Sequence, residues 1–224
     1  MVLALGATAG AGSPPSLDGC LSASRTTRLV RFAAGRERLA AAVVGSGPVG
    51  VVLANQTDNS VCEWLPLPSY LADHGMQVLA FDYGNGDDSA EVHAAARYLR
   101  AHGGRRLVLI GASIGGAVVI DAGVHLHPQP SAVVSLSAVP EVTSYPFPAD
   151  AQRLRSPIFQ IGASDDPLTQ YGKDTRLLYR ASPSPGKRLL LVPGSAHGVD
   201  FVSSNGTTTI RNAILRFIRT HTRT

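Results

Sequence analysis

Short apolar runs recur along the chain and predict β-strands. Two of them, 27–33 and 38–44, flank Gly35-Arg36 and predict an antiparallel hairpin. Six further runs, most of them rich in β-branched residues, lie at 49–54, 77–81, 106–110, 131–136, 157–161 and 188–192. Continuous apolar runs of this kind are typical of strands buried on both faces of a sheet. The pattern therefore predicts eight strands in a mostly parallel sheet with an antiparallel start.

Helical segments separate several of these runs. Asp87-Asp88-Ser89 supplies N-cap candidates for a helix that closes at Gly103-Gly104. The apolar face of this helix consists of Val92, Ala95, Ala96 and Leu99. The last helix has an apolar stripe of Ile210, Ile214, Phe217 and Ile218, and an outer face of Arg211, Arg216 and Arg219 that is expected to meet water. Strands that alternate with helices predict an α/β fold with helices on both faces of the sheet.

Composition supports a globular protein. The chain has 224 residues, 44% of them hydrophobic and 16% charged, and it contains no internal repeat or low-complexity block. We expect one domain over 27–224, since a core of this size needs no metal or partner for stability. The net charge is only +4, and aromatic residues are scattered rather than interleaved with basic ones. This argues against a nucleic-acid partner.

The first 26 residues differ from the rest. Residues 1–12 are apolar and small, but they are too short to span a bilayer and lack a basic leading region. We interpret 1–26 as a signal-peptide remnant followed by an extended segment, which predicts an exported protein without stable membrane insertion. The alternative is a cytoplasmic protein.

The chain has two cysteines, Cys20 and Cys62. In an exported protein two cysteines more often pair than stay free, and on the chain-entropy model a bond closing this loop contributes about 4 kcal/mol. Two free thiols in a cytosolic protein are the alternative. Lipid attachment at Cys20 is a further one, although Asp18 fits such a site poorly.

The strongest candidate for chemistry is Ser113, in the stretch Gly111-Ala112-Ser113-Ile114-Gly115 between an apolar strand and an apolar helix. A serine on a sharp strand-to-helix turn needs glycines beside it, because strand and helix approach closely there. The turn exposes the serine hydroxyl. It also places the amide of Ile114 at a helix N-terminus, where it can donate to an oxyanion.

A serine nucleophile needs a base, and His197 is the best of the seven histidines. It follows the eighth strand, on a loop at the same edge of the sheet as Ser113. The other histidines have plainer explanations. His74 and His102 lie at helix ends, where a cation complements the helix dipole, and His93 lies within a surface helix. His125 and His127 have no carboxylate cluster nearby, so we predict no metal site.

A carboxylate must orient the histidine, and two candidates follow the seventh strand. Asp166 precedes Pro167 and is interpreted as a helix N-cap. Asp165 is closer to the strand end and is the predicted acid. Asp200 shares the loop of His197 and is a poorer candidate.

The order of these residues resembles the α/β-hydrolase superfamily over almost the whole chain, from about Thr27 to His221. Ser113, Asp165 and His197, after the fifth, seventh and eighth strands, match its nucleophile, acid and histidine. The resemblance implies a second oxyanion donor in the loop after the third strand, the amide of Gln56 or Thr57. Many relatives have His-Gly where Asn55-Gln56 stand. Cys62 to Pro66, together with Cys20, looks like exported bacterial hydrolases of this type.

The resemblance also bears on the substrate side. Many relatives insert a helical cap between the sixth and seventh strands, but only about 20 residues, 137–156, separate them in this chain. Three prolines in that segment oppose a helix, so we expect an open site without a cap domain. The chain is similar to compact, lidless serine esterases and to dienelactone-hydrolase-like proteins, although the latter typically carry a cysteine nucleophile. Tyr145 and Phe147 are candidate substrate-lining residues.

Together these features predict hydrolysis of carboxylic esters through an acyl-enzyme, with no cofactor. The same residues could serve an acyltransferase, a thioesterase or a lactonase. A binding protein that keeps the fold without turnover is the alternative of another class, because a fold alone does not establish activity.

Overall fold

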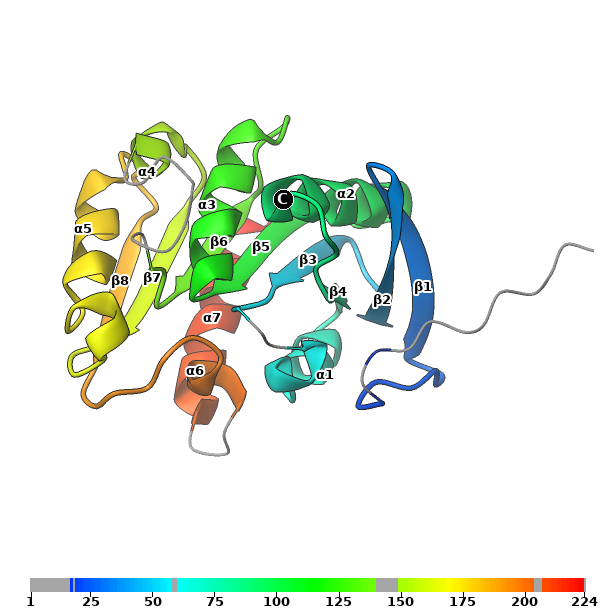
Figure 1. The fold of residues 1–224 in the computed structure, drawn as a ribbon, viewed down its shortest axis with the longest axis horizontal. Coiled ribbons are helices and arrows are strands. Elements are labelled where there is room, and N and C mark those ends of the chain that lie inside the picture. The colour runs from blue at the N-terminus through cyan, green and yellow to red at the C-terminus, as the bar shows by residue number, and fades with distance from the viewer. Residues whose placement is uncertain (1–16, 18, 58–59, 140–148, 204–206, 224) are drawn as a thin grey trace, which may run out of the picture.

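The eight predicted strands form one sheet in the computed structural model of the chain, which describes residues 17, 19–57, 60–139, 149–203 and 207–223 (Figure 1). The strands are β1 (Thr27–Ala34), β2 (Glu37–Gly45), β3 (Val49–Ala54), β4 (Met76–Phe81), β5 (Arg106–Ala112), β6 (Ala132–Leu136), β7 (Ile158–Ala163) and β8 (Arg188–Val192). Their order in the sheet is β1-β2-β4-β3-β5-β6-β7-β8. Strand β2 is antiparallel to both of its neighbours, and β3 to β8 are parallel. The predicted antiparallel start and mostly parallel sheet are confirmed.

Helices cover both faces of the sheet, so the predicted three-layer arrangement is also confirmed (Figure 1). One layer contains α2 (Asp88–Ala101), α3 (Ile114–His125), α4 (Ala149–Arg153) and α5 (Lys173–Ala181). The opposite layer contains the short helix η1 (Val61–Trp64), α1 (Leu67–Ala72), α6 (Asp200–Ser203) and α7 (Thr208–His221). The turn η3 (Pro167–Thr169) follows β7. In the described part of the connection between β6 and β7, α4 is the only helix, and no separate cap is evident.

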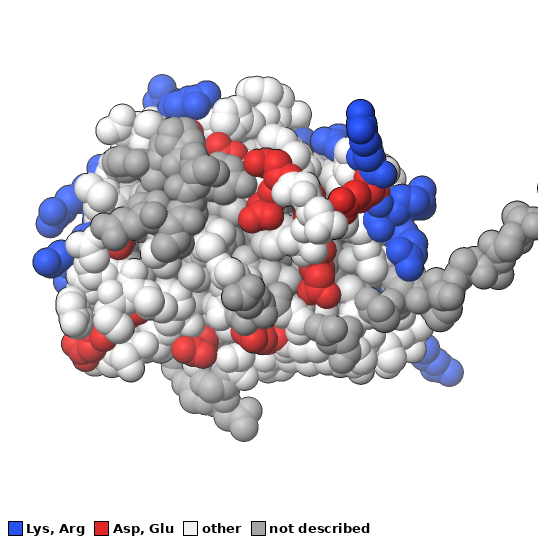
Figure 2. Space-filling view, in the orientation of Figure 1, with Lys and Arg blue, Asp and Glu red and all other residues white. Residues whose placement is uncertain are grey.

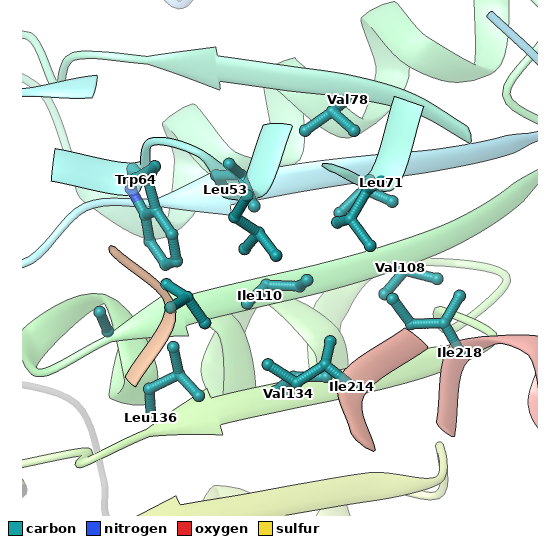
Figure 3. Packing of buried hydrophobic residues seen from close by; sticks show 14 of the residues in the cluster. Leu53, Trp64, Leu71, Val78, Val108, Ile110, Val134, Leu136, Ile214 and Ile218 are labelled. Carbon is teal, nitrogen blue, oxygen red and sulfur yellow. The ribbon is translucent and has the colours of Figure 1, made fainter. Parts of the chain in front are cut away.

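Alternate residues of each strand serve the two layers. Val51 and Leu53 of β3 pack with α1, α6 and α7, whereas Val52 packs with α2 and α3. Figure 3 shows the first of these clusters, in which Trp64 lies near Leu53 and Ile214 lies beside Val134. Because strands β3 to β7 are buried on both faces of the sheet, their residues are mostly apolar. This explains the continuous runs in the sequence.

Two helix features can be compared with the prediction. The Asp87 carboxylate accepts a hydrogen bond from the Ala90 amide at 2.8 Å, which confirms the N-cap of α2. Arg211, in contrast, does not face water and is only 7% exposed. Its guanidinium donates to the Val202 carbonyl at 2.7 Å and to the Thr207 hydroxyl at 2.8 Å. The prediction for Arg211 was wrong because its side chain joins α7 to α6.

A disulfide links Cys20 to Cys62 and confirms the predicted pairing. It fastens the segment before β1 to the start of η1, and Leu17 and Leu21 from the same segment are buried in the core. The proposed signal-peptide remnant lies almost entirely outside the described residues. None of the helices that the structure describes has the length and hydrophobicity needed to cross a bilayer.

Removing this bond should lower stability. Loop-closure entropy predicts that Cys20→Ser/Cys62→Ser loses about 4 kcal/mol of unfolding free energy. Urea titration followed by tryptophan fluorescence measures the loss, since the chain has one tryptophan. The wild type under reducing conditions should unfold at the midpoint of the double variant. Identical midpoints for the oxidised wild type and the variant would contradict the expectation.

Candidate active site

Ser113 lies at the sharp turn between β5 and α3, with φ of 52° and ψ of −118°. This backbone conformation is strained for a residue with a side chain, and it points the hydroxyl out of the turn. The neighbouring glycines make it sterically possible. A Cβ on Gly111 would lie 2.0 Å from the carbonyl oxygen of Gly115, and a Cβ on Gly115 would lie 2.2 Å from that of Ala54. Helix α3 can therefore begin directly against β3 and β5.

His197 reaches Ser113 from the loop after β8. Its Nε2 lies 2.9 Å from the Oγ of Ser113, within hydrogen-bond distance. The side chain is 15% exposed, so the imidazole is partly shielded from water. The backbone amide of His197 donates to the carboxylate of Asp200 at 3.1 Å, which holds the loop against the first residue of α6.

The carboxylate beside His197 belongs to Asp166, not to Asp165. Oδ2 of Asp166 lies 2.7 Å from Nδ1 of His197, and the Asp166 side chain is 1% exposed. The other oxygen, Oδ1, accepts from the Leu168 amide at 3.0 Å and caps η3. The predicted N-cap role of Asp166 is therefore confirmed. The prediction of Asp165 as the acid is not supported, because the two oxygens of Asp166 allow one carboxylate both to cap η3 and to contact the histidine.

Asp165 is exposed and supports the loop of His197 from the other end. Its Oδ2 accepts from the Gly194 amide at 3.1 Å, and its own amide donates to the Gly194 carbonyl at 2.9 Å. These bonds join the loop after β7 to the loop after β8. Asp165 thus contacts the backbone that carries the histidine and not the imidazole.

A cavity of about 410 Å³ opens beside the serine, and we call it the serine cavity. It is lined by Gln56, Thr57, Ser113, Ile114, Val139, Leu168 and His197. Ile114 is the first residue of α3, so its amide has no acceptor within the helix. The structure therefore brings together Ile114, Gln56 and Thr57, the three residues predicted to supply oxyanion donors.

The loop after β3 is held by two side chains of its own. Asn55 is buried, accepts from the Trp64 indole at 2.7 Å and donates to the Phe81 carbonyl at 3.0 Å. Oε1 of Gln56 accepts from the Val199 amide at 3.2 Å, and its Nε2 lies 3.4 Å from the Glu63 carboxylate. Gln56 thus joins this loop to the loop of His197, a link that the sequence did not suggest.

A second, polar cavity of about 310 Å³ adjoins the first and shares Gln56, Thr57 and Ile114 with it. We call it the acidic hollow. Its remaining lining residues are Asn55, Asp82, Tyr83 and Asp88. Burial, together with the negative charges of Glu91 and Asp87, raises the pKa of Asp88 to about 6.

The other residues considered in the sequence lie away from this site or outside the described residues. The imidazoles of His74, His102 and His125 each lie within hydrogen-bond distance of a backbone carbonyl four residues earlier in the chain. Among the described residues, no group of three or more His, Cys, Asp or Glu side chains is arranged to hold a metal ion. Tyr145 and Phe147 lie outside the described residues.

Comparison with known proteins now identifies the class. A model of the alpha/beta hydrolase family matches residues 59–211. The match spans more than half of the chain, and the protein therefore belongs to the alpha/beta hydrolase family. A search of curated proteins finds no match.

Solved structures share this fold at low sequence identity. A dienelactone hydrolase from Anabaena variabilis is 18% identical with a TM-score of 0.71, over 88% of this chain and 98% of that chain. An esterase from Pyrococcus furiosus is 15% identical with a TM-score of 0.73, over 88% and 92%. A monoacylglycerol lipase from Paleococcus ferrophilus is 16% identical with a TM-score of 0.69, over 82% and 99%. At such identities the likeness establishes the fold.

The contact between the two loops can be tested at Gly198. Its φ is +53°, and a Cβ there would lie 2.0 Å from Oε1 of Gln56. We expect Gly198→Ala to push Gln56 off the Val199 amide. The variant should then react with a fluorophosphonate, which labels activated serines, up to about tenfold more slowly, as loss of one hydrogen bond worth about 1 kcal/mol beside the loop of His197 implies.

The matched control is Gly194→Ala in the same loop. Gly194 also has a positive φ, +99°, but a Cβ there meets nothing within 4 Å. Gly194→Ala should therefore slow labelling only through the strain of a positive φ on an alanine. The double variant Gln56→Ala/Gly198→Ala should recover part of the labelling rate that Gly198→Ala loses, because the clash with Gln56 is removed. Equal labelling rates for the two single alanine variants would show that contact with Gln56 is unimportant.

Proposed function

We propose that the protein is a serine hydrolase that cleaves carboxylic esters through an acyl-enzyme. The observation that carries this proposal is the continuous line of contacts from Ser113 through His197 to Asp166, at 2.9 and 2.7 Å. A serine hydroxyl becomes a nucleophile when a base takes its proton, and a buried carboxylate on the far nitrogen keeps the base in the required tautomer. Asp166 replaces Asp165 as the acid in this proposal.

The reaction has two halves. In the first, Oγ of Ser113 attacks the ester carbon while Nε2 of His197 takes the hydroxyl proton. The negative oxygen of the tetrahedral intermediate accepts from the amide of Ile114 and from that of Gln56 or Thr57. The intermediate collapses, and the leaving alcohol receives the proton from Nε2. In the second half, water attacks the acyl group in the same way and releases the acid.

Every group in this scheme comes from the chain, so the scheme requires no cofactor. The lining of the serine cavity by Val139, Leu168 and Ile114 suits a small apolar group beside the scissile bond. The structural neighbours named as an esterase and a lipase support hydrolysis of esters over other acyl transfers. Product analysis with an added alcohol or thiol separates hydrolysis from transfer.

We further propose that the protein works outside the cytoplasm. The Cys20–Cys62 bond supports this, because disulfides persist mainly in oxidising compartments.

Substitution of the triad tests the assignment. Ser113→Ala should abolish hydrolysis of short-chain p-nitrophenyl esters, and Asp166→Asn should lower kcat by about 10³- to 10⁴-fold because the imidazole loses its orienting charge. Asp165→Asn should retain activity within about fivefold, since the Asp165 carboxylate accepts from the Gly194 amide and the Ser164 hydroxyl and does not contact the imidazole. Circular dichroism checks that each variant is folded.

The two aspartate variants form a matched pair at adjacent positions. A large loss in Asp165→Asn with little loss in Asp166→Asn would reverse the assignment of the acid. Equal turnover by the wild type and Ser113→Ala would refute the proposed function. Lack of covalent labelling of the wild type by a fluorophosphonate would instead favour a binding protein that keeps the fold.

A further inference from the structure

The segments at the carboxyl ends of the parallel strands contain acidic residues but no Lys or Arg. The segments that lead from the carboxyl ends of β3, β4, β6, β7 and β8 to the next helical element are 55–60, 82–87, 137–148, 164–166 and 193–199. None of the 20 Lys and Arg residues lies in them, although the chain has a net charge of +4. Described acidic residues in these segments are Asp82, Asp87, Asp165 and Asp166. The proposed active site therefore lies at an acidic edge of a basic protein.

The picture of the surface agrees with this distribution. Figure 2 shows acidic side chains across the viewed face, with Lys and Arg side chains around its outline. Along the chain after β7, the first basic residue is Lys173, the first residue of α5. A cleft lined by charges of one sign changes the local concentration of charged ligands.

Negative charge is concentrated in and beside the acidic hollow. Asp88 lines the hollow, and Glu91 of the same helix accepts hydrogen bonds from the amides of Gly84 and Gly86 at 2.8 and 3.1 Å. Neither Asp88 nor Glu91 takes part in any ion pair between described residues. Repulsion by Glu91 and Asp87 contributes to the raised pKa of Asp88. A cation in the hollow would relieve this repulsion.

The chemistry of the proposed reaction determines which half of the substrate reaches the hollow. The leaving alcohol must lie beside Nε2 of His197, which returns its proton. His197 lines the serine cavity but not the acidic hollow, so the alcohol belongs in the serine cavity. The oxyanion residues Gln56, Thr57 and Ile114 separate the two spaces and line both. The acyl part of the ester therefore extends towards the acidic hollow.

We propose that the acidic hollow receives a cationic group on the acyl part of the substrate, so that the enzyme prefers aminoacyl and ammonioacyl esters to neutral esters of the same shape. This inference rests on the serine-hydrolase function proposed above and specifies its substrate class. The proposed ligand of the acidic hollow is thus an organic cation that forms part of the ester.

Three p-nitrophenyl esters of matched length test the inference. The cationic ester is that of γ-trimethylammoniobutyric acid. The neutral ester is its isostere, in which a quaternary carbon replaces the nitrogen. The anionic ester is that of γ-sulfobutyric acid. At about pH 7.5 Asp88 is ionised, because its pKa is about 6. At about 10 mM ionic strength we expect kcat/KM for the cationic ester to exceed that for the neutral ester by about tenfold, with the anionic ester slowest. At about 500 mM salt the preference should fall to about twofold.

Asp88→Asn should lower the ratio of cationic to neutral kcat/KM by about threefold or more, because it removes a charge from the hollow with little change in shape. Asp73→Asn is the matched control. Asp73 is an exposed carboxylate between α1 and β4, at the amino end of the sheet. The same change in net charge there should leave the ratio at its wild-type value. Salt dependence in the wild type tests the inference even if Asp88→Asn fails to fold.

The outcomes separate the two proposals. Three results would overturn the cationic substrate class without affecting the serine-hydrolase function. These results are similar kcat/KM values for all three esters, a cation preference that salt does not weaken, or the same ratio of cationic to neutral kcat/KM in folded Asp88→Asn and Asp73→Asn. Absence of Ser113-dependent turnover with every ester would overturn both. A ratio that falls with salt and with Asp88→Asn alone would support the inference.

Discussion

The turn that carries Ser113 lies between backbones that nearly touch. The carbonyl oxygens of Ala54 and Asn55 occupy the space of a Cβ on Gly115, and the carbonyl of Gly115 occupies that of a Cβ on Gly111. This contact between β3, β5 and α3 places the amide of Ile114 next to the loop after β3. The proposed oxyanion donors thus come from strands that are neighbours in the sheet but separated by more than 50 residues in sequence. The other loops of the site are arranged around this fixed point.

Prediction from the sequence succeeded where one local pattern determines one structure. Strands β3 to β7 are buried on both faces and must be mostly apolar, so they are visible in the sequence as continuous runs. The partly exposed outer strands β1 and β8 still show as shorter apolar stretches. A serine between glycines after a strand indicates the sharp turn. Several helices were less visible. Helix α1 begins at Leu67 between Pro66 and Pro68, a stretch that looks like a turn, and α5 has mostly polar residues. Their positions depend on packing against the sheet.

The errors at the site arose where one residue has two roles or two neighbours compete. Asp165 and Asp166 are adjacent carboxylates, and only the path of the chain after β7 decides which of them is buried against His197. Arg211 lies on the expected outer face of α7, yet α6 covers it. The bridge made by Gln56 joins residues 143 positions apart and leaves no local signal. Such long-range contacts depend on the folded arrangement of loops, which one sequence does not display.

The disulfide connects the segment before β1 to this arrangement. Cys62 lies in η1, as does Trp64, whose indole donates to Asn55 in the loop after β3. The bond therefore adds a covalent tether to the short helix whose indole supports the loop that carries Gln56 and Thr57. Reduction of the bond would leave the hydrogen bond from Trp64 to Asn55 as a support of that loop but would detach η1 from the segment before β1.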